Sequence, residues 1–118
     1  MRFSICITAL LALSAQAAVA QDLADGRYGC TISSYFLGEI EIAGGLYRGP
    51  AFDGKFGPDY PFDLVGGTIN WGGPLGGISD AGTIVSTVLG KTYGDRIGFD
   101  VTIQNDRGNF QTITCTPV

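Results

Sequence analysis

The chain has 118 residues and a formal net charge of −4 at pH 7, with 11 acidic residues, 7 basic residues and no histidine. This acidity argues against nucleic acid and anionic lipid as partners, because both attract basic surfaces. The absence of histidine excludes a serine–histidine nucleophile and removes a common ligand of zinc sites.

Residues 1–20 have the pattern of a cleavable secretory signal. Arg2 is followed by an apolar run from Phe3 to Leu13, and Ala18 to Ala20 form a small-residue cleavage site. The run is shorter than the roughly 20 residues that a membrane-spanning helix needs. We therefore expect export to the periplasm or the extracellular medium. Residues 21–118 would remain as a single β-domain without a stable membrane anchor.

Two cysteines remain after removal of this signal, one near each end of the domain. Cys30 and Cys115 would then lie in an oxidising compartment, where thiols pair. No histidine is available to activate a thiolate or to complete a zinc site. The sequence therefore predicts a structural disulfide that joins the start of the domain to its end.

Glycines separate short apolar and β-branched segments along the domain. All 19 glycines lie after residue 20, and no apolar period of 3.6 residues is sustained. This pattern predicts short strands joined by tight turns. The expected strands are Arg27–Ile32, Gly38–Ala43, a return strand from Leu46, Tyr60–Leu64, a segment with Ile69 and Trp71, Thr83–Leu89, Arg96–Ile103 and Phe110–Thr116.

Three of these regions carry more specific expectations. Ile40 and Ile42 alternate with glutamates ahead of Gly44-Gly45, which predicts a hairpin with a two-residue turn. The segment Thr83–Leu89 is apolar and β-branched on both faces, so we expect both of its faces to be covered. Gly72–Gly77 is expected to contain no regular element.

About eight strands connected in chain order form an antiparallel meander. The expected disulfide joins the first strand to the last, so the two ends of the meander would lie side by side. An all-β meander whose ends meet is a small closed barrel, which leaves no exposed sheet edge. A two-sheet sandwich is the alternative.

The segment Gly49–Pro61 is the leading candidate for a binding site. It combines Phe52, Phe56 and Tyr60 with aspartates, glycines and prolines. Aromatic rings on a stiff loop supply contact area at low entropic cost. The candidate binding residues are therefore Phe52, Phe56, Asp59 and Tyr60. In the alternative interpretation, the same rings fold back and plug one end of the barrel.

Two other interpretations concern carboxylates and the single tryptophan. Asp53, Asp59 and Asp63 cluster around the loop, and glycoside hydrolysis uses two carboxyl groups at a fixed separation. Their spacing does not match a calcium-binding loop, and aspartate is common in turns. We therefore expect no enzyme activity, no metal and no cofactor. Trp71 either fills the core or lines a ligand cavity.

The segment Gly26–Cys30, the glycine-separated strands and the cysteine near the end resemble small exported bacterial proteins of unassigned function. The chain is also similar to periplasmic inhibitors of C-type lysozyme, which are small disulfide-bonded β-barrels with Tyr-x-Cys near the start, here Tyr28 and Cys30. The inhibitory loop of that family, Ser-Gly-x-x-Tyr, corresponds to Ala43–Tyr47, with alanine in place of serine. This similarity implies a barrel that binds a lysozyme through this loop.

The sequence thus predicts an exported, non-enzymatic binding module that acts as a monomer. Its expected partner is a protein or a small apolar ligand, contacted through the aromatic loop or a barrel end. Three alternatives stay open: a structural component of the envelope or matrix, a protein similar to the lysozyme inhibitors, and a hydrolase.

Overall fold

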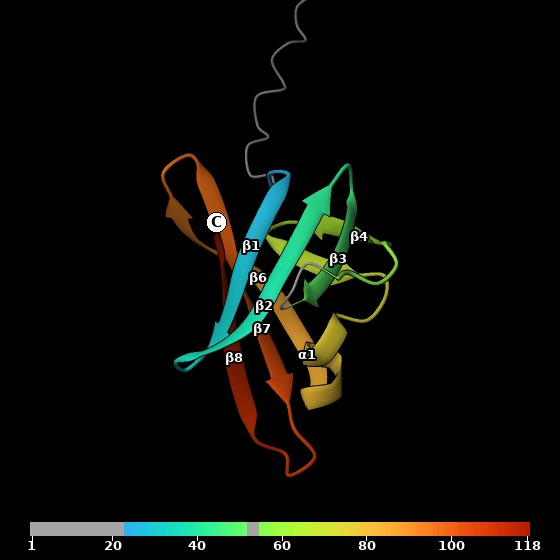
Figure 1. Ribbon diagram of the computed structural model, residues 1–118. Coiled ribbons are helices and arrows are strands. Elements are labelled where there is room, and N and C mark those ends of the chain that lie inside the picture. Colours follow the sequence, from blue (N-terminus) through green and yellow to red (C-terminus); the bar gives the residue numbers. More distant parts are fainter. Residues whose placement is uncertain (1–22, 52–54) are drawn as a thin grey trace, which may run out of the picture.

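The computed structural model describes residues 23–51 and 55–118, so the expected signal at residues 1–20 and the loop residues Phe52 and Asp53 lie outside the described residues. Eight antiparallel strands follow one another in chain order and close into a β-barrel (Figure 1). The predicted all-β meander and its closure into a barrel are confirmed.

The strands are β1 (Gly26–Ile32), β2 (Tyr35–Ala43), β3 (Leu46–Ala51), β4 (Tyr60–Val65), β5 (Thr68–Trp71), β6 (Thr83–Tyr93), β7 (Arg96–Gln104) and β8 (Phe110–Pro117). One short helix, α1 (Gly76–Ala81), lies between β5 and β6 in the chain. Among the described residues, no helix has the length and apolar character needed to cross a membrane.

The barrel closes where β1 meets β8, and the disulfide lies within that contact. Cys30 is the ladder partner of Cys115, with the two Cα atoms 4.0 Å apart, and their sulfur atoms are bonded. The bridge spans 85 residues of the chain, and both cysteines are fully buried. The predicted disulfide is therefore confirmed, and it reinforces the main-chain pairing that closes the barrel.

Arg96 adds a second connection at the same closure. Its guanidinium group donates hydrogen bonds to the carbonyl oxygens of Arg27 and Val118, each at 3.1 Å. The same group lies 4.8 Å from the centroid of the Tyr28 ring. Arg96 therefore binds β7 to the first and last strands at one end of the β1–β8 contact.

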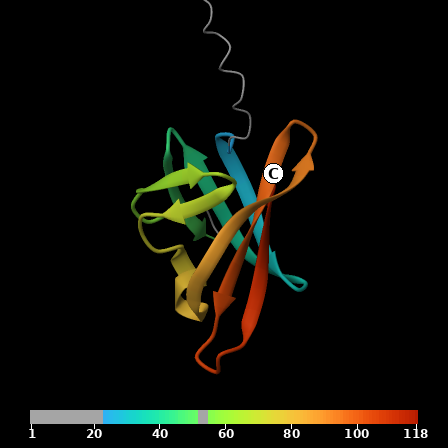
Figure 2. The ribbon, with the colours of Figure 1, turned by 180° about the vertical axis from the view of Figure 1, so that it is seen from behind.

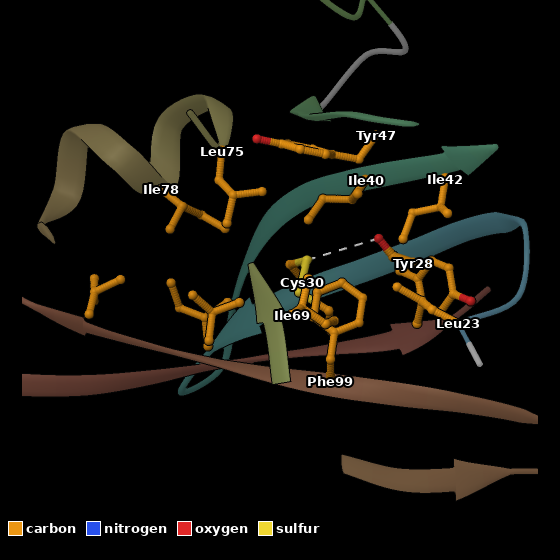
Figure 3. Close-up of a cluster of buried hydrophobic side chains, with 14 residues drawn as sticks. Leu23, Tyr28, Cys30, Ile40, Ile42, Tyr47, Ile69, Leu75, Ile78 and Phe99 are labelled. Atoms are coloured by element: carbon orange, nitrogen blue, oxygen red, sulfur yellow. Dashed lines mark hydrogen bonds between the residues drawn. A yellow bond between two sulfur atoms is a disulfide. The ribbon is translucent and has the colours of Figure 1, made fainter. Parts of the chain in front are cut away.

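The core consists of the inward-facing residues of the alternating strands. Figure 3 shows Ile40 and Ile42 on β2 and Phe99 on β7 pointing toward one another across the interior. A row of aromatic rings crosses this core, with centroid distances of 5.4 Å from Tyr28 to Phe99 and 5.6 Å from Phe99 to Trp71. The alternation read in the sequence therefore gave the correct inward faces of β2 and β7.

Part of the glycine-rich segment Gly72–Gly77 is helical, so the expectation that it contains no regular element was wrong. α1 begins at Gly76, and the side chains of Leu75, directly before the helix, and of Ile78, within it, are buried. The main-chain N–H of Leu75 donates to Ser79 Oγ at 2.8 Å. Burial of two apolar side chains three residues apart offsets the low helix propensity of the glycines.

β6 differs from its expected form in length and in coverage. It continues to Tyr93, and Val85 and Val88 are 51% and 44% exposed, so its two faces are not both covered. The register with β7 shifts between Ile84 and Ser86, which indicates a β-bulge at Val85. The expectation of a strand covered on both sides was wrong because the barrel wall is a single closed sheet, so one face of β6 has no second layer packed on it.

Removing the disulfide with Cys30→Ala and Cys115→Ala should lower the free energy of unfolding by about 4–5 kcal/mol. A bridge over a loop of this length restricts the unfolded chain and so raises the relative stability of the folded state. Equilibrium urea denaturation of the oxidised protein and the double variant measures the difference. Reductant should destabilise the wild type and leave the double variant unchanged, whereas equal stability of the two oxidised samples would contradict this account.

Candidate binding cleft

Phe56, from the described part of the aromatic segment, lies against the outer wall of the barrel. The ring centroid of Phe56 lies 5.5 Å from the guanidinium carbon of Arg27 on β1 and 4.8 Å from that of Arg48 on β3. Gly49 allows this approach, since a Cβ at that position would lie 3.1 Å from the Phe56 ring and 2.6 Å from the carbonyl oxygen of Glu39. Phe56 therefore packs on the wall and does not plug a barrel end.

Charged side chains from β1, β2 and β3 surround the Phe56 ring. The guanidinium group of Arg48 donates to Glu41 Oε1 at 2.8 Å, and Arg27 Nε lies 3.6 Å from Glu41 Oε2. The hydrogen bond from Arg48 is the main cause that lowers the pKa of Glu41. Asp59 Oδ1 lies 3.9 Å from Arg48 Nε. The candidate residue Asp59 therefore belongs to a surface ion-pair cluster.

Tyr60 lies on the inner side of β4, away from this cluster. It is the ladder partner of Tyr47, and the two ring centroids are 6.0 Å apart. Its ring also covers Gly73, where a Cβ would lie 2.3 Å from the nearest ring carbon. The structure therefore places Phe56 and Asp59 together on the outer wall, and Tyr60 apart from them in the aromatic row.

A cleft of about 380 Å³ lies between β5 and β6. The two strands pair only at Thr68 and Val88, and the N–H of Leu89 donates to the carbonyl oxygen of Gly67 at 2.9 Å beside that pair. From this point the strands diverge, and the segment that contains α1 connects their separated ends (Figure 2). The residues lining the cleft are Thr68, Ile69, Asn70, Trp71, Gly73, Ile84, Val85, Ser86 and Thr87.

Trp71 forms part of the cleft and of the core. Its indole Nε1–H donates to Thr87 Oγ1 at 2.7 Å, so the side chain reaches from β5 to β6. Its ring packs against those of Tyr47, Phe62 and Phe99, with centroid distances of 4.6, 5.9 and 5.6 Å. Both interpretations of Trp71 therefore apply, since it fills the core and lines the cavity.

The chemistry of the lining is uncharged. Within the described part of the chain, its polar side chains are the amide of Asn70 and the hydroxyl groups of Thr68, Ser86 and Thr87. The remaining side chains are aliphatic or aromatic. The described residues also contain no group of three or more metal-ligating side chains. This lining suits an uncharged ligand with both hydrogen-bonding and apolar groups.

Tyr47 holds one edge of the cleft in place. Its hydroxyl group donates to the carbonyl oxygen of Gly73 and accepts a hydrogen bond from the N–H of Gly73 at 2.9 Å. Burial raises the pKa of the Tyr47 hydroxyl above its ordinary value of 10.0. Because Tyr47 is fully buried, the segment Ala43–Tyr47 does not present its tyrosine at the surface.

Comparison with known proteins was made for the whole chain. No protein-family model matches it, and neither a curated protein nor a solved structure matches it at a significant level. The functional argument therefore depends on the geometry of the described residues.

Tyr47→Phe should lower the free energy of unfolding by about 1–3 kcal/mol, because it leaves the partly buried N–H of Gly73 without an acceptor. The raised pKa of the Tyr47 hydroxyl group also makes the free energy of unfolding depend on pH. The hydroxyl group contributes its full stability below pH 10.0, and this contribution is lost as the pH rises through the higher folded-state pKa. Urea denaturation near neutral pH and above pH 10.0 should show a steeper alkaline loss in the wild type than in the variant. Equal alkaline losses would contradict the assignment to Tyr47.

Proposed function

We propose that this protein is an exported, non-enzymatic binding module that holds its ligand in the cleft between β5 and β6. The observation that carries the proposal is the single residue pair that joins these two strands, beside which a cleft of about 380 Å³ opens. This volume falls within the range of about 300–1,000 Å³ that is usual for ligand pockets.

The aromatic loop receives less support as the ligand site. Phe56 lies against two guanidinium groups, Asp59 lies beside Arg48, and Tyr60 packs on Tyr47 and Gly73. These side chains are therefore engaged in contacts within the chain, and a partner would have to displace them. In this proposal Phe56 and Asp59 stabilise the outer wall, and the cleft receives the ligand.

The absence of histidine from the sequence and the uncharged lining support a non-enzymatic role. A hydroxyl group in the cleft needs a general base to become a nucleophile, and no described lining residue has a basic or acidic side chain. Of the aspartates considered for hydrolysis, Asp59 lies beside Arg48 and Asp63 is exposed on β4. This arrangement supports binding over hydrolysis.

Export and solubility are part of the proposal. The secretory pattern at residues 1–20 supports export, and the buried Cys30–Cys115 disulfide is compatible with an oxidising compartment such as the periplasm or the extracellular medium. The acidic composition supports a partner other than nucleic acid or anionic lipid. We further propose that the protein acts as a monomer.

Ser86→Arg should weaken ligand binding strongly, because it places a long charged side chain in the mouth of the uncharged cleft. Trp71 is the only tryptophan, so its fluorescence emission reports on the cleft directly. The measurement is a titration with a panel of uncharged glycans, small apolar compounds and short peptides. At least one probe should change the emission of the wild type. Ser86→Arg should lower the affinity for that probe by at least about tenfold, which corresponds to roughly 1.4 kcal/mol.

Two control variants make this experiment specific to the cleft. Thr112→Arg introduces the same side chain on β8, two strands away from Ser86 and outside the cleft lining, and should bind as the wild type does. Phe56→Ala should also bind normally, with a stability loss of about 1 kcal/mol from its cation–π contacts. Loss of binding in Phe56→Ala with normal binding in Ser86→Arg would identify the loop as the site instead.

A further inference from the structure

We propose that the ligand of the cleft is an extended peptide segment, which pairs as a β-strand with the free edges of β5 and β6. This rests on the proposed function and adds the class of partner and its mode of contact. It is argued from the direction of the main-chain groups, the state of the tryptophan ring and the surrounding charge.

β5 directs main-chain groups into the cleft at Trp71. Asn70 pairs with Asp63 on β4, and the N–H of Gly72 donates to the carbonyl oxygen of Pro61 at 2.8 Å. Neighbouring residues of a strand direct their main-chain groups to opposite sides. The N–H and C=O groups of Trp71 therefore point toward β6, where they have no ladder partner.

β6 offers a matching edge on the other wall. The N–H of Leu89 points to β5, where Gly67 accepts its hydrogen bond, so Thr87, two residues earlier, also faces β5. Next along this edge is Val85, which the register shift leaves without a ladder partner on β7. Bulges of this kind end regular pairing and redirect a strand. The cleft is thus bordered by strand edges on both walls.

A peptide strand is the ligand that satisfies such edges best. Unpaired N–H and C=O groups at a sheet edge are a template for an added strand, and main-chain hydrogen bonds provide the affinity in this mode of recognition. Val85 is 51% exposed at this edge and lines the cleft, so an apolar side chain of an added strand can pack on it. The site would therefore favour peptides in which every second side chain is apolar.

A glycan is the less favoured ligand, because the tryptophan ring is already engaged by three neighbouring rings and a hydrogen bond. Sugar rings bind proteins largely by stacking on a free aromatic face. Here the ring of Trp71 packs on Tyr47, Phe62 and Phe99, and its Nε1–H is bound to Thr87. Less of the indole is therefore open for stacking, and the cleft offers mainly hydroxyl and amide groups.

Charge near the cleft favours a peptide with basic flanking residues. The lining itself is uncharged, but Asp63 is exposed on β4 opposite Asn70, and Asp80 is exposed on α1, which contacts β6. The whole chain carries a net charge of −4. Complementary charge at the rim accelerates association and selects partners. The expected partner is an alternating apolar segment bounded by lysine or arginine.

The first test uses short peptides and the intact, oxidised protein. Binders selected from a random library of short displayed peptides should be alternating and basic at their ends, and should change the emission of Trp71. N-methylation at each position in turn removes one N–H at a time. It should weaken binding by about tenfold at each central position, because an added strand directs alternate N–H groups to β5 and to β6, and by less than about twofold at the flanking positions outside the cleft. An effect of less than about twofold at every position would overturn the proposal.

The second test changes the protein at the same edge. Val85→Pro removes the N–H of Val85, which has no ladder partner on β7 to lose, whereas Val85→Thr keeps that N–H and a β-branched side chain. Peptide affinity should fall by about tenfold in the proline variant and by less than about twofold in the threonine variant. Circular dichroism checks that both variants fold. If the proline variant does not fold, the N-methylation series decides.

The remaining outcomes separate this inference from the proposed function. Peptide binding that is equal in the wild type and Ser86→Arg would overturn the cleft as the site. A glycan or small molecule that binds the wild type but not Ser86→Arg, without any peptide binder, would leave the cleft standing and overturn the peptide. Self-association that Val85→Pro prevents, again without peptide binding, would identify a second copy of the chain as the occupant and also overturn the peptide.

Discussion

The contact between the first and last strands determines the rest of the structure. Cys30 and Cys115 are ladder partners and are joined covalently, so the main-chain pairing and the disulfide act on the same point. Arg96 extends the contact by binding carbonyl oxygens on β1 and at the end of the chain. With both ends of the meander held together, the strands between them must curve into a barrel, and their inward side chains share one core.

Closure at β1 and β8 leaves the weakest part of the wall on another side of the barrel. β5 ends at Trp71 and is followed by two glycines, over one of which the Tyr60 ring fills the space of a side chain. The chain then passes through α1 before β6 begins, so β5 and β6 meet at one end only. The barrel therefore needs no continuous ladder at this point, and the cleft is compatible with the stability that the closure provides.

Local patterns in the sequence predicted much of this fold. The alternation around Ile40 and Phe99 identifies an inward face without any knowledge of neighbours, and the two cysteines of the domain could pair only with each other. The helix α1 could not be predicted in the same way, because it depends on the burial of Leu75 and Ile78 against distant strands. The exposure of Val85 likewise follows from the lack of a second layer over one face of the wall, which no property of β6 itself reveals.

The site was harder to predict than the fold for the same physical reason. Aromatic and acidic residues mark a segment as suited to binding, but the arginines that hold Phe56 come from β1 and β3, far from it in the chain. The cleft arises where two strands fail to pair, and such a failure leaves no recognisable motif in the sequence. Its walls are nevertheless held without a ligand, by the hydrogen bonds from Trp71 to Thr87 and between Tyr47 and Gly73. A site held in this way loses little conformational freedom on binding, so more of the interaction free energy appears as affinity.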